Sequence, residues 1–403
     1  MTPDTHAMLG ASSAERWLNC PPSAMLTAGM PDQTSPYAEE GRIAHSAAEL
    51  KVRKWMNQLT PKAYKKALTE LQATHTALFE KNEADADQRD TSWKEIEHCT
   101  DTYLDAVKEA YAAAGEFPYL ALEQMVDFSI WVPGGFGTAD CVIIGNRQLH
   151  IIDYKHGKGI QVQAEDNPQL KLYALGAFER YAMLYEISSV RWSIVQPRNG
   201  GVSQAEPITS MDLLTWAEGS VRPIAEQAGK GEGAYAVGEW CRFCKAKAAC
   251  RARSDYNLEM EHFSSTAPAL LTNDELGGIL QRSRDLAAWS KDMEAYVLRM
   301  LLTGAKIPGW KAVEGRSVRI WTNQEAAFRT ATETGIEEAM LYERKPVTLA
   351  TLEKLLGKKQ FEPLQPFIII PPGKPTLAPE TDKRPPITAR ATAEDDFGAV
   401  EGE

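Results

Sequence analysis

Apolar residues near the start of the chain recur every three or four positions, which is the spacing of amphipathic helices. The segment SSAERWLN predicts a first helix, with Ser12 and Glu15 forming a capping box and the helix ending near Cys20. The same spacing predicts a second helix over residues 37–55.

Residues 60–114 keep the helical period, interrupted by a polar, acidic connection at 81–92. This helical material separates the second helix from the first expected strand. The sequence therefore indicates a helical insertion at about 55–115.

From residue 119 the period changes to the alternation that is typical of strands. Strands are expected at 120–132, 137–144 and 148–155, and Gly145-Asn146 fits a two-residue hairpin turn between the last two. This turn would place Asp140 opposite Ile151, with Asp153 as its diagonal neighbour at about 7–8 Å between Cα atoms. Two carboxylates would then lie on one sheet face, together with Lys155.

A further helix is expected after this hairpin, with Asn167 as its N-cap and Pro168 in its first position, and it should end near Tyr181. The strand VRWSIVQPR follows. This order of strands and helices predicts an α/β core with a mixed sheet flanked by helices.

The last third of the chain predicts a long amphipathic helix at 270–304, a strand or strand pair at 309–321, and two short helices within 325–360. Prolines dominate from residue 363 onward, which predicts an extended and then disordered acidic tail. The expected parts are a main domain, an α+β appendage and the tail, at 1–255, 256–362 and 363–403.

The formal net charge of -11 excludes a chain that is basic over its whole surface, so contact with a polyanion would need a local basic region. One such cluster is Arg242, Lys245, Lys247, Arg251 and Arg253. It could face phosphates or simply be the solvated face of a helix. The sequence has neither a membrane-length apolar run nor a signal-peptide pattern, so we expect a cytosolic protein without a membrane partner.

Polar residues with chemical potential recur at regular spacing within these elements. Gly41, His45 and Glu49 share one helix face, and Gly41 would allow another segment to approach closely. Gln169 and Tyr173 share a face of a later helix. Each feature has an ordinary explanation, because a helix often carries an isolated histidine and a D-x-K pair is often a surface ion pair.

The order of these features is more specific than any of them separately. G-x3-H-x3-E, then G-x2-D at Gly137 and Asp140, then IIDYK, then Q-x3-Y, resembles the motif series of RecB-like PD-(D/E)XK nucleases. The opening SSAERWLNCP resembles an element of the same group. The resemblance covers about residues 9–255 and implies a restriction-endonuclease-like core.

The resemblance implies a role for each matching residue. His45, Asp140 and Asp153 correspond to ligands of Mg²⁺ or Mn²⁺, with the Tyr154 carbonyl as a further ligand. Lys155 corresponds to the residue that orients or deprotonates the attacking water, and Glu123 matches an acidic position common in the group. Residues expected to contact the substrate are Gln169, Tyr173, Arg242 and Lys245.

Three cysteines, Cys241, Cys244 and Cys250, crowd together far from Cys20 in the sequence. Four sulfur ligands suit either zinc or iron-sulfur, and the C-x2-C pair does not decide between them. The whole arrangement resembles the iron-staple nucleases, which include AddB-type subunits and CRISPR-associated adaptation nucleases. That resemblance implies a structural 4Fe-4S cluster, whereas Cys99 and Cys141 are expected to be buried thiols.

These features together favour a Mg²⁺- or Mn²⁺-dependent DNA exonuclease. The C-terminal stretch GKPTLAPETDKRPP resembles an uncharacterised phage and prophage family, which implies a role in phage recombination or replication beside a single-strand-binding or annealing protein. Two other hypotheses stay open, namely a catalytically inactive iron-sulfur DNA-binding scaffold or assembly factor, and a zinc-bound regulatory protein. A Walker A motif is not apparent, so ATP-driven unwinding would need another protein.

Overall fold

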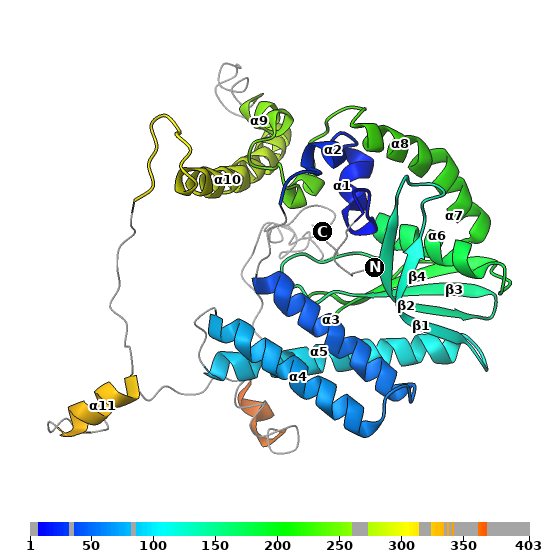
Figure 1. Ribbon diagram of the computed structural model, residues 1–403, viewed down its shortest axis with the longest axis horizontal. Coiled ribbons are helices and arrows are strands. Elements are labelled where there is room, and N and C mark those ends of the chain that lie inside the picture. Colours follow the sequence, from blue (N-terminus) through cyan, green and yellow to red (C-terminus); the bar gives the residue numbers. More distant parts are fainter. Residues whose placement is uncertain are drawn as a thin grey trace, which may run out of the picture. The chain divides into compact units, whose positions relative to one another are not determined.

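A six-stranded mixed sheet with helices on both faces forms the centre of the first of two units, Met1–Val313 (Figure 1). The second unit is Glu314–Glu403. The computed structural model describes residues 7–31, 36–81, 86–259, 273–313, 324–333, 337, 341 and 362–368.

The strands follow the order β1-β2-β3-β4-β5, and β6 pairs with the other end of β4. Only β3 and β4 run parallel among these neighbours, and α6 connects them, while every other described pair is antiparallel. The mixed α/β architecture expected from the sequence is therefore confirmed. The strands are Tyr119–Asp127, Phe136–Gly145, Gln148–Tyr154, Ser189–Gln196, Gly201–Gln204 and Ile208–Thr209.

The hairpin register differs from the prediction by one residue on each strand. Gly145 pairs with Gln148 and Cys141 with Ile152, so the two turn residues are Asn146 and Arg147, both with positive φ. Continuing this register by one residue places Asp140 opposite Asp153. The expected pairing of Asp140 with Ile151 is wrong, and the two aspartates are cross-strand neighbours, for which the usual spacing is about 4.5–5.5 Å between Cβ atoms.

Alternate residues of the strands enter two separate cores. Val142, Ile151 and Ile194 pack with α6 on one face of the sheet. Ile143 and Ile152 pack with α3 and α5 on the other face. Because both faces are covered, the sheet is held between two helical layers (Figure 1).

The helices follow the predicted order closely. Asn167 caps α6 by accepting from the Leu170 N–H at 3.2 Å, and the expected helices near 37–55 and 270–304 are present as α3 and α10. The polar connection expected at 81–92 is shorter than predicted, because α5 begins at Ala86. The α-helices of the first unit are Ala14–Asn19 (α1), Ser23–Thr27 (α2), Pro36–Trp55 (α3), Pro61–Lys81 (α4), Ala86–Ala113 (α5), Pro168–Tyr181 (α6), Ser210–Trp216 (α7), Arg222–Lys230 (α8), Arg251–Leu258 (α9) and Asn273–Leu302 (α10).

The first helix begins differently from the expectation. A 3-10 turn at Ala11–Ser13 leads into α1, and the Ser13 hydroxyl donates to the Gly10 carbonyl, so the cap has no side-chain hydrogen bond. The capping box of Ser12 and Glu15 is therefore wrong. Trp17 is buried and donates its indole N–H to the same carbonyl, which fixes the start of the chain on the core.

The first strand is shorter than expected. It ends at Asp127, whose carboxylate accepts from the Ser129 N–H and turns the chain, so residues 128–132 are not part of a strand. A turn of this kind is a common way for aspartate to end a strand.

The C-terminal expectations are tested only in part. Residues 309–313 form no strand, while 314–321 and most of 334–360 lie outside the described residues. In the second unit, Gln324–Glu333 forms helix α11, and Glu362–Phe367 forms a 3-10 turn rather than extended chain. The boundary expected after residue 255 falls within the first unit and stays a prediction, and the tail from 369 onward lies outside the described residues.

Candidate metal centre and cysteine cavity

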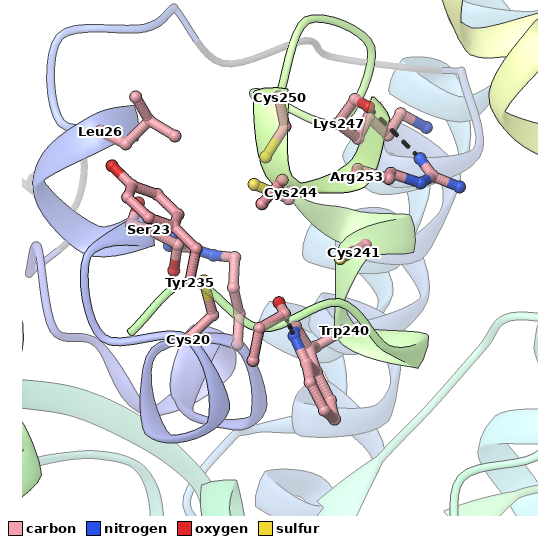
Figure 2. Close-up of a pocket in the computed structure, with 13 residues that line it drawn as sticks. Cys20, Ser23, Leu26, Tyr235, Trp240, Cys241, Cys244, Lys247, Cys250 and Arg253 are labelled. Atoms are coloured by element: carbon pink, nitrogen blue, oxygen red, sulfur yellow. Dashed lines mark hydrogen bonds between the residues drawn. The ribbon is translucent and has the colours of Figure 1, made fainter. Parts of the chain in front are cut away.

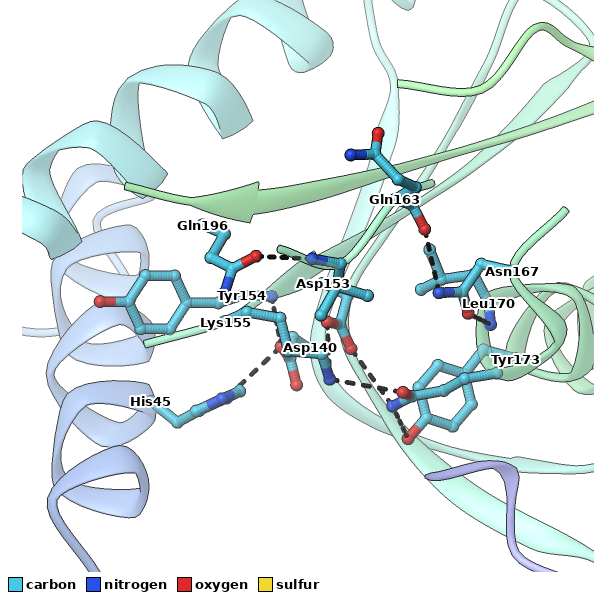
Figure 3. Close-up of polar contacts among 12 residues, drawn as sticks. His45, Asp140, Asp153, Tyr154, Lys155, Gln163, Asn167, Leu170, Tyr173 and Gln196 are labelled. Carbon is cyan, nitrogen blue, oxygen red and sulfur yellow. Dashed lines mark hydrogen bonds and ion pairs between the residues drawn. The ribbon is translucent and has the colours of Figure 1, made fainter. Parts of the chain in front are cut away.

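Polar side chains from both helical layers meet at the ends of the central strands. His45 comes from α3, Asp140 from β2, Asp153 from β3 and Tyr173 from α6 (Figure 3). His45 and Tyr173 approach the two aspartates from opposite sides in this view. The fold therefore brings together residues that lie far apart in the sequence.

Three of these groups form a compact set of potential metal ligands. Donor atoms of His45, Glu123 and Asp140 all lie within 4.8 Å of one another. The His45 Nδ1 atom is 3.4 Å from Asp140 Oδ2, and the same oxygen accepts from the Tyr154 N–H at 2.7 Å. Asp140 is thus held from two sides through one of its oxygens.

Glu123 lies in β1 opposite Asp140, between the paired residues Leu122 and Gln124. Its φ is +48°, in the left-handed region that a non-glycine residue rarely adopts, least of all within a strand. Strained backbone of this type is concentrated at functional sites because the surrounding structure must maintain it. The strain supports a specific role for the Glu123 carboxylate.

Asp153 is not part of this compact set, and its side chain instead contacts Lys155 and also Gln169 of α6. Its Oδ2 atom lies 2.9 Å from Lys155 Nζ, and Gln169 joins the pair by accepting from Lys155 at 3.4 Å and donating to Asp153 Oδ1 at 3.5 Å. The Gln169 amide also donates to the Tyr173 hydroxyl at 3.1 Å. The four side chains form one chain of contacts across the sheet end.

Gly137 is required for the position of Tyr173. A Cβ atom on Gly137 would lie 2.7 Å from the Tyr173 ring, so a larger residue would push the ring away. The expected role of Gly41 is not seen among the described residues, because none of their atoms lies within 4 Å of a Cβ atom built there.

Burial and neighbouring charges set the protonation of this site. Burial raises the pKa of Asp153, which Asp140 reinforces and Lys155 opposes, and the net direction is upward. Burial would also raise the pKa of Asp140, but His45 and Lys155 reverse this, so it lies below its usual value. Burial, with Asp140 and Glu49 beside it, raises the pKa of Glu123 to about 7, although much of that residue is exposed.

The donor set fits a divalent cation. Asp153 is 2% exposed, and apart from the close approach of Lys155 its Oδ2 has no hydrogen-bond partner. Carboxylate oxygens with one imidazole are ligands that suit Mg²⁺ or Mn²⁺. A buried carboxylate is costly unless a cation neutralises it, and Lys155 already supplies one such charge to Asp153.

A second buried network, which no sequence pattern indicates, supports this site. Glu40, only 9% exposed, accepts from Ser92 of α5 at 3.0 Å and lies 3.6 Å from His156 and 3.4 Å from Arg198. His156 in turn contacts the Tyr154 hydroxyl at 2.9 Å. The network joins α3, α5 and the chain just after Lys155.

Replacing Glu40 by glutamine is expected to lower the free energy of unfolding by about 3 kcal/mol at neutral pH, because the largely buried Arg198 loses one of its two carboxylate partners and keeps Glu95. Burial would raise the pKa of Glu40, but His156 and Arg198 lower it to about 2. A lowered carboxyl pKa stabilises the fold above the ordinary value of about 4.5 and loses that effect as the pH falls toward 2.

Urea unfolding at pH 7 and pH 3 measures this difference, with Glu39→Gln as the matched control on the more exposed neighbouring residue. The two variants should differ strongly at pH 7 and much less at pH 3. Equal stability of the two variants at pH 7 would contradict the role of Glu40.

The cysteines meet in a second place. Cys20, Cys241, Cys244 and Cys250 line one cavity between α1, α2 and the segment before α9 (Figure 2). Burial raises the pKa of the Cys241 and Cys244 thiols, although Arg253 acts against it at Cys241 and Arg16 at Cys244. The expected meeting of the N-terminal cysteine with the later three is therefore observed, and Cys99 and Cys141 are buried away from this cavity, as expected.

The spacing of these thiols bears on the choice of metal. Among the described residues, no three cysteine sulfurs lie within 4.8 Å of one another. Four sulfurs around one tetrahedral zinc at 2.3 Å would lie about 3.8 Å apart. A cavity lined by four thiols suits a metal centre, and both zinc and an iron-sulfur cluster take such ligands.

The basic cluster is divided between two environments. Arg242 is exposed, and Lys245 donates to the Met30 carbonyl at 3.2 Å. Lys247 and Arg253 instead pair with aspartates of α10, and Arg253 is 2% exposed. Lys247 and Arg253 are therefore held by carboxylates of α10, so of the two alternatives left open for the cluster neither describes Arg253.

Comparisons with known proteins give one broad match. The family model described as "Protein of unknown function (DUF2800)" matches residues 6–385. A solved structure described as "Crystal structure of SSO0001" is 12% identical, covering 60% of this chain and 96% of that one, with a TM-score of 0.24. This second likeness is too low to carry an argument about fold or function. None of the described helices combines the length and apolarity that a membrane span needs.

Proposed function

The chain belongs to the DUF2800 family, and we propose from its own residues that it is a divalent-cation-dependent DNA nuclease with a PD-(D/E)XK core of the RecB-like type. The observation that carries the proposal is the facing pair Asp140 and Asp153 with Lys155 beside it. A structural role would hardly require two carboxylates opposite each other at a sheet end, because their charges repel.

His45, Glu123, Asp140 and Asp153 are the residues that would hold the cation. A cation bound there would neutralise the negative charge that protects a phosphodiester and would acidify a nearby water molecule. The Tyr154 N–H fixes the Asp140 carboxylate, so this ligand needs no rearrangement. The Tyr154 carbonyl stays a predicted further ligand.

Lys155 supplies the remaining positive charge at the site. Its pKa lies above the usual value: burial lowers it, but Asp153 and Asp140 more than offset that effect. Lys155 therefore stays protonated in this arrangement, which favours a role in orienting water and stabilising the developing phosphate charge over a role as the base.

Gln169 and Tyr173 would hold the substrate beside this centre. Gln169 contacts Asp153, Lys155 and Tyr173. A nucleotide that replaced one of these hydrogen bonds would therefore change the contacts of the Asp153 carboxylate. The Tyr173 ring offers a stacking surface that does not depend on base identity. Arg242 and Lys245 would contact the DNA backbone farther away.

We propose further that the cysteine cavity holds a 4Fe-4S cluster that joins the N-terminal helices to the segment before α9. The convergence of four thiols on one cavity supports a metal centre there, and the resemblance to iron-staple nucleases favours a cluster over a single zinc ion. The role is structural, because the link closes a loop of more than two hundred residues between Cys20 and Cys241. A partnership with a phage single-strand-binding or annealing protein stays a prediction.

The enzyme is expected to degrade DNA from its ends. Helices α4 and α5 pack against α3, which carries His45, and this helical layer would restrict access to a threaded strand. Labelled linear and circular single strands of equal length, incubated with the protein and Mn²⁺, measure this preference. Linear DNA should be consumed at least about tenfold faster, whereas rapid cutting of the circles would indicate an open, endonucleolytic site.

A further inference from the structure

A buried arginine lies beside the cysteine cavity and faces away from solvent. Arg253 is in the first turns of α9, three residues after Cys250, and lines the cavity (Figure 2). Its Nη1 atom donates to the Lys247 carbonyl at 3.4 Å, and Lys247 lies between Cys244 and Cys250. The guanidinium thus holds the loop that carries two of the cysteines.

The partners of this arginine come from α10. Arg253 Nη2 lies 3.0 Å from Asp285 Oδ1, and Nη1 lies 3.1 Å from Asp292 Oδ2. Asp292 also binds Lys247 Nζ at 2.7 Å through its other oxygen. One carboxylate of α10 therefore holds two points of the cysteine loop.

Two further contacts extend the same surface of α10. The Trp289 indole N–H donates to the Ala248 carbonyl at 3.2 Å, and this side chain is 8% exposed. Asn257 donates to Asp285 Oδ2 at 3.3 Å. Asp285, Trp289 and Asp292 have the i, i+4, i+7 spacing of one helix face, so the whole face is directed at the cysteine segment.

We propose that α10 is a structural part of the cysteine centre and that its Asp285, Trp289 and Asp292 face is a clamp that holds the cysteine loop in its metal-binding conformation. This inference rests on the proposed metal occupancy of the cavity. Residues after Cys250 then serve the centre as positioning residues, although they supply no ligand.

The local structure of the loop explains the need for a clamp. Residues 244–250 form turns rather than regular structure, and Cys250 at the start of α9 provides no side-chain cap. The loop therefore depends on contacts from outside itself. Outer contacts of this kind, which fix the geometry of metal ligands, affect metal affinity by about 10- to 100-fold when they are removed.

The effect of the clamp on metal binding implies an equal effect of metal binding on the clamp. If the clamp strengthens metal binding, then metal binding strengthens the docking of α10 by the same factor, since the two effects share one free energy. Loss of the metal should therefore loosen α10. The chain would carry a link between occupancy of the cysteine cavity and the segment that continues beyond residue 302.

The full-length variants Asp292→Asn and Trp289→Phe test the first direction, with Glu294→Gln as a matched control on an exposed position of the same helix. Each protein is purified anaerobically, its iron and zinc per chain are measured, and the rate of metal loss to a chelator is followed. Asp292→Asn should lose metal about tenfold faster than wild type, Trp289→Phe should lie between them, and Glu294→Gln should match wild type.

Amide hydrogen exchange in the wild-type chain before and after chelation tests the reverse direction without any variant. Exchange in residues 285–292 should rise when the metal is removed, while exchange in α6 stays unchanged. Metal retention equal to the control in Asp292→Asn, or unchanged protection of α10 after chelation, would overturn the clamp alone. A wild-type chain that never carries metal would overturn both the clamp and the proposed cysteine centre.

Discussion

Asp153→Asn is expected to reduce DNA cleavage by at least about 10³-fold at saturating Mn²⁺, because the cation loses a carboxylate that would bind it in the transition state. The asparagine keeps the shape of the side chain and removes one of two facing negative charges, so folding should be retained. Initial rates on labelled linear DNA, together with a binding assay without metal, separate loss of catalysis from loss of DNA binding.

Asp166→Asn is the matched control, since it makes the same chemical change on an exposed residue next to the α6 cap. Its ion pair with Lys171 lies at the surface and contributes little. Asp140→Asn should behave like Asp153→Asn. Cleavage by the Asp153 variant at the rate of the Asp166 variant would remove Asp153 from the catalytic centre.

Cys250→Ala is expected to lose the bound metal entirely and to unfold at much lower denaturant concentration than wild type. Metal that binds only the folded chain contributes its binding free energy to stability, and this contribution disappears with the ligand set. Iron, zinc and acid-labile sulfide per chain, followed by urea unfolding under anaerobic conditions, measure both effects.

Cys99→Ala is the control for this change, because Cys99 is a buried thiol outside the cavity. The Cys99→Ala protein should keep the full metal content. Its free energy of unfolding should fall only by the small amount expected when a buried side chain is shortened. Wild-type protein with one zinc and no iron or sulfide would replace the proposed cluster with a zinc site. Equal metal content in the two variants would exclude Cys250 as a ligand.

The periodicity of the sequence predicted most helices and central strands, since it reflects local burial directly. The hairpin register was wrong because the reason for Gly145 is not local. A Cβ atom there would lie 2.1 Å from the Ala114 carbonyl at the end of α5, so glycine is needed for packing and not for the turn. The turn itself uses Asn146 and Arg147, both at positive φ, and arginine is an unusual residue there.

In the candidate site, too, residues in local motifs could be identified from the sequence, whereas residues that depend on distant partners could not. The motif residues His45, Asp140, Asp153 and Lys155 could be selected from sequence because their types and order are distinctive. Glu40 and Arg253 could not, because their partners Arg198 and Asp292 are distant in the chain and nothing in the spacing connects them. Long-range pairing of buried charges becomes apparent only when the fold brings the elements together.

The measurement that tests the central claim most directly is the cleavage of labelled linear single-stranded and double-stranded DNA by the anaerobically purified wild-type protein. Matched reactions contain Mg²⁺, Mn²⁺ or a chelator, and each is compared with the Asp153→Asn protein prepared in parallel. The account predicts that wild type shortens the DNA only with a divalent cation and that the variant does not. DNA left intact by wild type with both cations, or shortened equally by the Asp153 variant, would contradict it.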